Sequence, residues 1–366
     1  MFLFSKYTKL ATKKKNRIKN KNLSNDIKKI IIIITKILLL IYIFYFSFLN
    51  NHKNKYINSR NEKDSLLDIT KEKELDGINE VNKTFDFENS TFGIVSRMDC
   101  PPCGLFSYYS VHLGCILTYL SQGYIPIIEV GSYYNVFNNF TPSDKDNPWE
   151  ILFNQPFGYT LEEVKKNAKK IEQLSCSWTN MAPSEGHIYQ NQMTMDFYRY
   201  MSKKYMSIKK EIMDEANIKW KQLFGDSNNI LGVLGRGTDF AQLRPGGHSI
   251  PPPTEKMIQD VKNMDEKHKY NWIYLATEDD SIRNNFINNF GKKLKMIQNT
   301  TISYSGGYLG DNKDVHGIEF QKMYLISMII LSKCIDIVAA RCSGTMGAFI
   351  FSEGFRESIV YFVGQF

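Results

Sequence analysis

Short apolar runs alternate with longer helical segments through the second half of the chain, and this alternation restricts the fold more than any other feature of the sequence. The apolar runs predict strands at residues 230–234, 271–276, 294–297, 335–340 and 358–363. Helical periodicity occupies the stretches between them, and two of the predicted helices end at glycines, Gly291 and Gly354. Strands separated by helices in this way form parallel, doubly wound sheets.

The first half of the folded region has a similar character. Its expected elements are a strand at 92–95, a helix at 106–121 stopped by Gly123, a strand at 124–130, a capping box at 160–163 and one or two amphipathic helices within 188–224. We therefore predict an α/β protein with two facing Rossmann-like lobes. An N-terminal lobe would span residues 91–225, and a C-terminal lobe would span residues 226–366.

The formal net charge of +8 is concentrated near the N-terminus. Residues 1–29 contain ten Lys or Arg and a single Asp, so the rest of the chain is close to neutral. A nucleic-acid-binding domain needs its basic residues on the folded body. We therefore expect no nucleic-acid partner.

An apolar run at residues 30–49 follows this basic tail and is near the length that a bilayer-spanning helix requires. Lys36 interrupts it, but a lysine near the end of a span can reach the membrane surface. Lys and Arg are denser before the run than after it, which places the N-terminus in the cytosol. A cleaved signal peptide is the alternative, although the run is long for one and no small-residue cleavage site follows. We predict a single-pass type II membrane anchor.

Residues 50–90 are rich in Lys, Asn, Asp and Glu, and they predict a solvated stem between the anchor and the folded body. Glycosylation sequons occur at Asn82, Asn89, Asn139 and Asn299. Together with the anchor they favour the secretory pathway, and the Golgi if the cell is eukaryotic.

The stretch 229–239, NILGVLGRGTD, ends a predicted buried strand in small and charged residues. Ligands of open α/β sheets bind outside the carboxyl ends of the strands. Gly235 and Gly237 leave the main chain accessible beside Arg236, and a guanidinium group matches phosphate oxygens in a bidentate manner. We expect Arg236 to bind a diphosphate. The alternative is a structural ion pair with Asp239.

Two other predicted strands end in polar residues, at 277–280 (TEDD) and 343–345 (SGT). Parallel strands would bring these ends to the same edge as Arg236. Thr277 and Ser343 would each precede a helix, whose N-terminal amides suit a phosphate group. The alternative is that both residues only cap their helices.

These three motifs, RGTD at 236–239, TEDD at 277–280 and SGT at 343–345, resemble those of the GT-B fucosyltransferase superfamily, which includes α1,2-, α1,6- and protein O-fucosyltransferases. The segments 103–106 (CGLF) and 147–153 (NPWEILF) are similar to the first lobe of the α1,6 branch. The resemblance covers roughly residues 91–366 and implies a GT-B fold of two lobes. The N-terminal lobe, 91–225, would be the acceptor side, and the C-terminal lobe, 226–366, would bind the nucleotide sugar.

The resemblance implies an inverting, metal-independent glycosyltransferase that moves fucose from the donor GDP-fucose to a glycan or glycoprotein, without a cofactor. Arg236 matches the arginine that binds the β-phosphate, and Asp239 matches the aspartate that closes the same motif; both are assigned to catalysis. Residues assigned to donor binding are Gly235, Arg236, Gly237, Thr238, His248, Thr277, Asp279, Ser343, Gly344 and Thr345. For His248, in a loop, a structural role is the alternative.

Three features depart from the superfamily pattern. Leu234 stands where the α1,6 branch has a histidine, and no carboxylate occurs at 241–244, where the acceptor base is expected. No aspartate near Ser327 matches the residue that binds guanine. The acceptor base and the guanine contacts therefore remain unassigned, and a catalytically silent, membrane-tethered glycan-binding protein is an alternative, as is a transferase for another GDP- or UDP-sugar.

Clustered carboxylates and cysteines suggest two other chemistries. The triplet 278–280 resembles the way GT-A transferases hold a manganese–nucleotide complex, since hard cations prefer oxygen ligands. Acidic residues also favour a helix N-terminus without any metal. Cys100 and Cys103 could form a local disulfide, whereas no second pair of ligands has the spacing of a zinc site.

Overall fold

The computed structural model of the 366-residue chain describes residues 85–100, 103–138, 141–143, 146–183, 189, 191–237, 244, 246, 248–297 and 317–366. The predicted basic tail, the anchor at 30–49 and most of the stem lie outside these residues. Within the described residues, no helix is long and apolar enough to cross a bilayer. Val81–Phe366 form one compact unit.

The C-terminal sheet has five parallel strands in the order β6-β5-β4-β7-β8. Its elements along the chain are β4 (Ile230–Gly235), α9 (Thr254–His268), β5 (Trp272–Thr277), α10 (Asp280–Phe290), η4 (Gly291–Lys293), β6 (Leu294–Lys295), α11 (Ile318–Ser332), β7 (Asp336–Ala340), α12 (Ser343–Phe351) and β8 (Ser358–Tyr361). Every strand predicted in this half is present.

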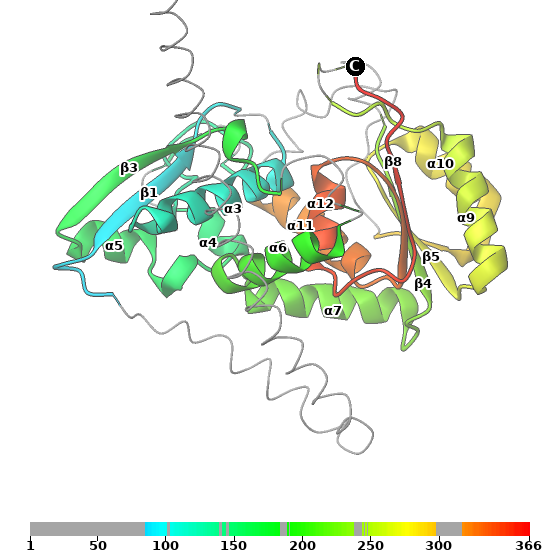
Figure 1. The fold of residues 1–366 in the computed structure, drawn as a ribbon. Helices are drawn as coiled ribbons and strands as arrows, with labels where there is room; N and C mark the ends of the chain where they lie inside the picture. Colours follow the sequence, from blue (N-terminus) through cyan, green and yellow to red (C-terminus); the bar gives the residue numbers. More distant parts are fainter. Residues whose placement is uncertain are drawn as a thin grey trace, which may run out of the picture. The chain divides into compact units, whose positions relative to one another are not determined.

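The strand order gives the C-terminal sheet a topological switch point. The chain moves outward from β4 through β5 to β6, and then returns to the other side of β4 with β7 and β8. Helices α9 and α10 lie on one face of the sheet, and α11 and α12 lie on the other (Figure 1). In such sheets the crevice at the carboxyl ends of the two diverging strands is where ligands bind. Here those strands are β4 and β7.

The N-terminal sheet has three parallel strands in the order β2-β1-β3. The elements of this half are β1 (Thr91–Arg97), α3 (Leu105–Ser121), β2 (Ile125–Ile128), α4 (Trp149–Leu152), η1 (Pro156–Gly158), α5 (Leu161–Asn167), β3 (Lys170–Cys176), η2 (Trp178–Asn180), α6 (Gln192–Tyr205) and α7 (Lys210–Phe224). Two parallel sheets with covering helices confirm the predicted α/β class. The boundary between lobes at residue 225 stays a prediction.

Several local signals in the N-terminal half have the predicted geometry. Gly123, with φ of 86°, follows the end of α3, a conformation that glycine adopts without strain. The capping box at the start of α5 is formed, because Thr160 accepts from the backbone N–H of Glu163 and the Glu163 carboxylate accepts from that of Thr160. The packed body also includes Phe87, whose ring contacts Phe92 ahead of the expected start at residue 91.

One apolar core joins helices from both halves. Phe106 of α3 packs edge-on against Tyr324 of α11 and Phe351 of α12, at centroid distances of 5.5 and 5.7 Å. A Cβ atom at Gly347 of α12 would lie 2.2 Å from the Phe106 ring. This close approach requires glycine, and it places α12 in direct contact with the first helix of the N-terminal half.

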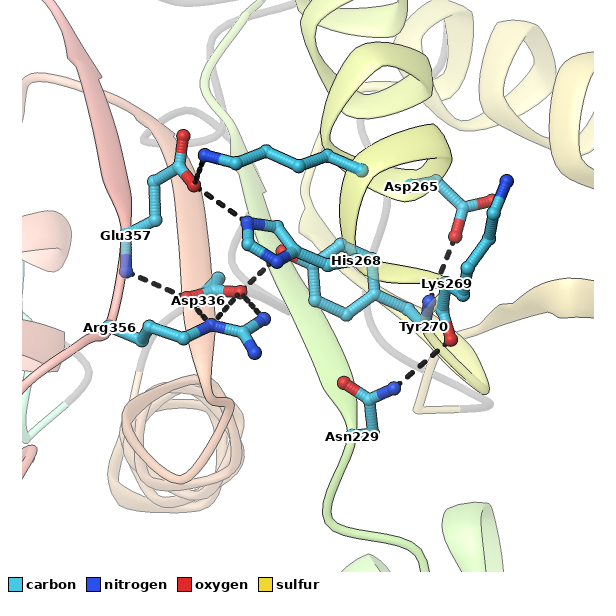
Figure 2. A network of polar contacts seen from close by, with 9 residues as sticks. Asn229, Asp265, His268, Lys269, Tyr270, Asp336, Arg356 and Glu357 are labelled. Atoms are coloured by element: carbon cyan, nitrogen blue, oxygen red, sulfur yellow. Dashed lines mark hydrogen bonds and ion pairs between the residues drawn. The ribbon is translucent and has the colours of Figure 1, made fainter.

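The opposite, amino-terminal edge of the C-terminal sheet is held by a network centred on Asp336 (Figure 2). Asp336 is completely buried and accepts hydrogen bonds from Tyr270, Arg356 and the backbone N–H of Glu357. Glu357 in turn contacts Lys267 and His268, each at 2.7 Å, and these two side chains lower its pKa. The network connects α9 to the start of β7 and β8.

We predict that Asp336→Ala reduces the free energy of unfolding by about 2–4 kcal/mol, because it leaves a buried tyrosine hydroxyl and a guanidinium group without their acceptor. Urea denaturation of the full-length chain measures this value. The control is Asp214→Ala, which removes an exposed ion pair with Lys210 and should cost less than about 1 kcal/mol. Equal losses for the two variants would contradict a structural role for the network.

Candidate functional site

The predicted site lies at the carboxyl edge of the C-terminal sheet. Gly235 is the last residue of β4 and pairs with Thr277 of β5, while Leu234 pairs with Ala339 of β7. Arg236, the residue after β4, therefore lies between the ends of its two neighbouring strands. This confirms the prediction that the three polar strand ends share one edge.

Arg236 forms an ion pair with Glu278. Its Nη1 atom lies 3.0 Å from Oε1 of Glu278, and both side chains are largely buried. The pair holds the guanidinium group across the end of β5, the neighbour of β4. Of the other residues in this motif, Thr238 and Asp239 lie outside the described residues, so their roles, and the alternative Arg236–Asp239 pair, stay predictions.

Asp279 begins helix α10. Its carboxylate accepts a hydrogen bond from the backbone N–H of Ile282 at 2.9 Å, and its own N–H donates to the Thr277 hydroxyl at 3.1 Å. Asp279, not Thr277, is therefore the N-cap. A Cβ at Gly237 would lie 2.2 Å from Oδ2 of Asp279, so glycine is needed for the chain to pass this carboxylate.

The turn after β7 leads directly into α12. Cys342 is the N-cap of α12 and makes no side-chain capping bond. Ser343 is the first helical residue, so the alternative in which Ser343 caps the helix is wrong. Thr345 is completely buried and its hydroxyl donates to the carbonyl of Ala340. A Cβ at Gly344 would lie 2.3 Å from the Tyr324 hydroxyl. Ser343 and Gly344 thus present the first turn of α12 at the edge where Arg236 lies.

His248 lies in an exposed loop that pairs with the last residues of the chain. Its carbonyl accepts from the backbone N–H of Phe366 at 3.1 Å, and the N–H of Ile250 donates to Gly364. The His248 ring has a contact of 3.4 Å with the carbonyl of Gly246. The backbone of His248 thus helps to join this loop to the last residues of the chain, and both the structural role of its ring and its contact with a donor stay predictions.

Sequence reasoning missed the partnership of Arg236 with Glu278 and a second arginine at the same edge. Arg341 follows β7 as Arg236 follows β4, and its guanidinium group lies over the Phe362 ring at 4.5 Å. Phe362 follows β8, on the side of β7 away from β4. The sequence could have indicated Arg341, because this cation directly follows a predicted strand, as Arg236 does. The pairing of Glu278 with Arg236 depends on the register between β4 and β5, which cannot be deduced from the sequence.

Ser327, near which the superfamily pattern places a guanine-binding aspartate, is buried in the interior of the protein. Ser327 of α11 forms a hydrogen bond of 2.8 Å with the hydroxyl of Tyr274, a fully buried residue of β5. Burial raises the pKa of Tyr274, so its hydroxyl stays protonated. This pair fixes α11 against the sheet and is not directed at a ligand.

The three carboxylates of 278–280 serve separate partners. Glu278 pairs with Arg236, Asp279 caps α10, and Asp280 accepts from Asn284 at 3.0 Å. Within the part of the chain that the structure describes, no group of three His, Cys, Asp or Glu residues is placed to hold a metal ion. Each carboxylate of the manganese alternative therefore has a different partner in this structure.

Solved structures similar to this chain include three fucosyltransferases. The match to NodZ from Bradyrhizobium has 13% sequence identity and a TM-score of 0.43, and covers 71% of this chain and 92% of NodZ. POFUT1 in complex with GDP-fucose matches with 10% identity and a TM-score of 0.47 over 76% of this chain and 99% of POFUT1. A mutant of Arabidopsis thaliana FUT1 in complex with GDP matches with 8% identity and a TM-score of 0.42 over 80% of this chain and 75% of FUT1.

No protein-family model matches the sequence, and no curated protein sequence matches it. These matches are to fucosyltransferases, the superfamily that the motifs resemble, and their TM-scores are all below 0.5. At these identities the likeness concerns the fold and assigns no role to any residue.

We predict that Gly237→Ala destabilises the site, because the added methyl group displaces Asp279 from the N-terminus of α10. The loss of a cap costs about 0.5–2 kcal/mol of the free energy of unfolding. Thermal and urea denaturation measure the loss. The matched control is Gly246→Ala, where a Cβ meets nothing within 4 Å. If the two alanine variants are equally stable, Gly237 does not approach Asp279 as described.

Proposed function

We propose that this chain is an inverting, metal-independent glycosyltransferase that transfers fucose from GDP-fucose to a glycan or glycoprotein. One observation carries the proposal: Arg236 directly follows the first strand of a doubly wound sheet at its switch point, on the edge of the sheet from which β7 leads into α12. A largely buried guanidinium group and the first turn of a helix are two different kinds of phosphate-binding group. Their meeting at one edge suits a diphosphate.

The proposed chemical role of Arg236 follows from the negative charge that develops on the leaving diphosphate during transfer. In an inverting transfer the acceptor hydroxyl oxygen forms a bond to the sugar carbon while the bond from that carbon to the phosphate oxygen breaks. Negative charge then increases on the departing diphosphate. A guanidinium group that is already fixed by Glu278 stabilises this charge without reorganising, which is where electrostatic catalysis gains most. The group that accepts the hydroxyl proton is unassigned.

The identity of the donor rests on the motif resemblance at 236–239, 277–280 and 343–345. The same edge would also accommodate the diphosphate of another GDP- or UDP-sugar, which is the second proposal for the donor. The catalytically silent glycan-binding protein is the third. Arg236 argues against it, because a protein that binds glycans alone has no need of a diphosphate site.

The disulfides support the proposed placement of the body across a membrane. Cys100–Cys103 and Cys115–Cys176 are bonded, the first as the sequence suggested. Disulfides persist in oxidising compartments such as the secretory lumen. We propose a type II anchor at residues 30–49, with residues 91–366 in a secretory compartment where imported nucleotide sugar is present.

Arg236→Lys should retain the fold and lose GDP affinity. A lysine keeps the charge but loses the bidentate geometry, and a charge-assisted hydrogen bond contributes about 1.5–3 kcal/mol, or roughly ten- to a hundredfold in affinity. Thermal stabilisation of the full-length chain by GDP and GDP-fucose, compared with UDP-sugars, measures the change and ranks the donors.

The matched control for this variant is Arg356→Lys, at the opposite edge of the same sheet, where the arginine pairs with Asp336. It should bind GDP as the unmodified chain does. Undiminished stabilisation of Arg236→Lys by GDP would show that Arg236 does not hold the diphosphate. If no nucleotide sugar stabilises the unmodified chain, the glycosyltransferase proposal fails.

We also predict that transfer of fucose continues at an unchanged rate in excess EDTA, because Arg236 and the N-terminus of α12 supply the positive charge that a divalent cation provides in GT-A enzymes. Release of GDP, measured with and without EDTA, tests this. Inactivation by EDTA with recovery on added Mn²⁺ would restore the manganese alternative.

A further inference from the structure

The two disulfides among the described residues lie in different surroundings. Cys115 of α3 is 0% exposed and Cys176, the last residue of β3, is 2% exposed, so the folded protein shields their bond from solvent. Cys100 and Cys103, in the CPPC segment between β1 and α3, are both partly exposed. Exposed disulfides are the ones that exchange with thiols, whereas buried disulfides are structural. Cys100–Cys103 is therefore the bond that a reductant can reach in the folded protein.

The Cys100–Cys103 bond also constrains the chain less than the other disulfide does. It joins residues at a sequence separation of 3, whereas Cys115 and Cys176 are separated by 61. A disulfide stabilises a fold mainly by restricting the unfolded chain, and this effect grows with the length of the closed loop. Opening the shorter loop should consequently cost little of the free energy of unfolding.

A buried arginine contacts one of the two partly exposed sulfur atoms. Nη2 of Arg97 lies 3.8 Å from Sγ of Cys103, and Arg97 is 1% exposed. A neighbouring cation favours the thiolate form of a cysteine. Because this guanidinium group is buried, water screens its charge less than it would at the surface. The Cys103 sulfur is thus prepared to carry negative charge when the disulfide opens.

Hydrogen bonds hold the two cysteines near each other independently of the disulfide. The carbonyl of Cys100 accepts from the backbone N–H of Cys103 at 3.1 Å and from the hydroxyl of Tyr108 at 3.1 Å. Burial raises the pKa of Tyr108, so this hydroxyl keeps its proton and continues to donate. The reduced thiols should therefore remain close enough to form the bond again.

Asp99 supplies the opposing charge at this site. Its Oδ1 atom accepts from Nε of Arg97 at 2.8 Å, and its Oδ2 atom accepts from the backbone N–H of exposed Trp178 at 2.7 Å. Arg97 also donates from Nη1 to Ser107 at the start of α3. The carboxylate orients the guanidinium group, but its charge opposes a second negative charge on Cys103.

We propose that Cys100–Cys103 is a redox-active disulfide that exchanges with small-molecule thiols, with Arg97 stabilising Cys103 as the leaving thiolate. This role goes beyond the proposed transfer of a sugar and does not depend on it. It gives the chain a two-electron site that responds to the thiol–disulfide balance of its compartment.

The exchange takes place in two balanced steps, written here for glutathione. A glutathione thiolate attacks Sγ of Cys100, the bond between the two cysteines breaks, and its electron pair stays on Sγ of Cys103 beside Arg97. A second glutathione thiolate attacks the glutathione sulfur of the mixed disulfide, and the released Cys100 thiolate takes a proton from water. Two glutathione molecules are thereby oxidised to their disulfide, and the two electrons that they lose reduce the protein disulfide.

The test exposes the folded, full-length chain to excess reduced glutathione and stops the reaction at intervals by alkylation. Peptide mass spectrometry measures alkylation at each cysteine, with Cys115–Cys176 as the internal reference. Cys100–Cys103 should open about a hundredfold faster than this buried disulfide. The thermal unfolding temperature should change little at that stage and fall only when Cys115–Cys176 opens.

Two charge variants test the role of the arginine. Arg97→Gln should slow the opening of the CPPC disulfide about tenfold, because the leaving thiolate loses its cation. Asp99→Asn should speed it about threefold or more, because the charge that opposes the thiolate is removed. The matched controls are Lys169→Gln and Glu88→Gln, which remove one charge each from an exposed ion pair at the opposite edge of the same sheet. Both should stay within about twofold of the unmodified chain.

The proposal is overturned if the two disulfides open at the same rate, if Cys100–Cys103 opens only in urea, or if folded Arg97→Gln reacts as fast as the unmodified chain. If Arg97→Gln does not fold, Asp99→Asn decides the role of the cation, and an unchanged or slower rate in that variant overturns it. None of these measurements uses a nucleotide sugar, so their outcome is separate from that of the proposed transferase.

Discussion

The approach of Gly347 to Phe106 is the constraint on which the arrangement of this protein depends. It allows α12, which begins at the switch point of the C-terminal sheet, to pack directly against α3 of the N-terminal half. The far end of α12 is held as well, because Arg199 of α6 donates to the Phe349 carbonyl at 2.9 Å and to the Ser352 hydroxyl at 3.1 Å. A helix fixed at its middle and at its C-terminus presents its first turn in a defined position.

The Arg236–Glu278 pair would keep the proposed diphosphate site ready before its ligand arrives. An arginine alone at a strand end would lose side-chain entropy on binding. The carboxylate of Glu278 orients the guanidinium group in advance, and it also supplies a negative charge that tempers affinity for the anion. This balance would suit the proposed site, which must release a charged product. In the proposed site, Glu278 is thus a positioning residue that acts through Arg236.

Burial determined which parts of this structure could be predicted from the sequence. Strand β4 is buried along its whole length, so its continuous apolar run predicted the strand and the polar residues after it marked where the strand ends. Strand β3 was missed because it is an edge strand with Lys170, Glu172 and Gln173 exposed, and it shows no apolar run. The partner of Arg236 required the register that sets Gly235 against Thr277. The exposure of Trp178 depends on a turn fixed by Asp99, far away in the sequence, which no local pattern encodes.

Helix α3 connects the carboxyl edge of the N-terminal sheet to helix α12. In its first turn, Ser107 accepts from Arg97 at that edge, and Phe106 packs edge-on against Phe351, the last residue of α12. Both contacts are made by close-packed groups, and packed interiors transmit displacement because they have little free volume. In the proposed transferase, this packing would couple the position of α3 to that of α12, whose first turn is part of the proposed diphosphate site.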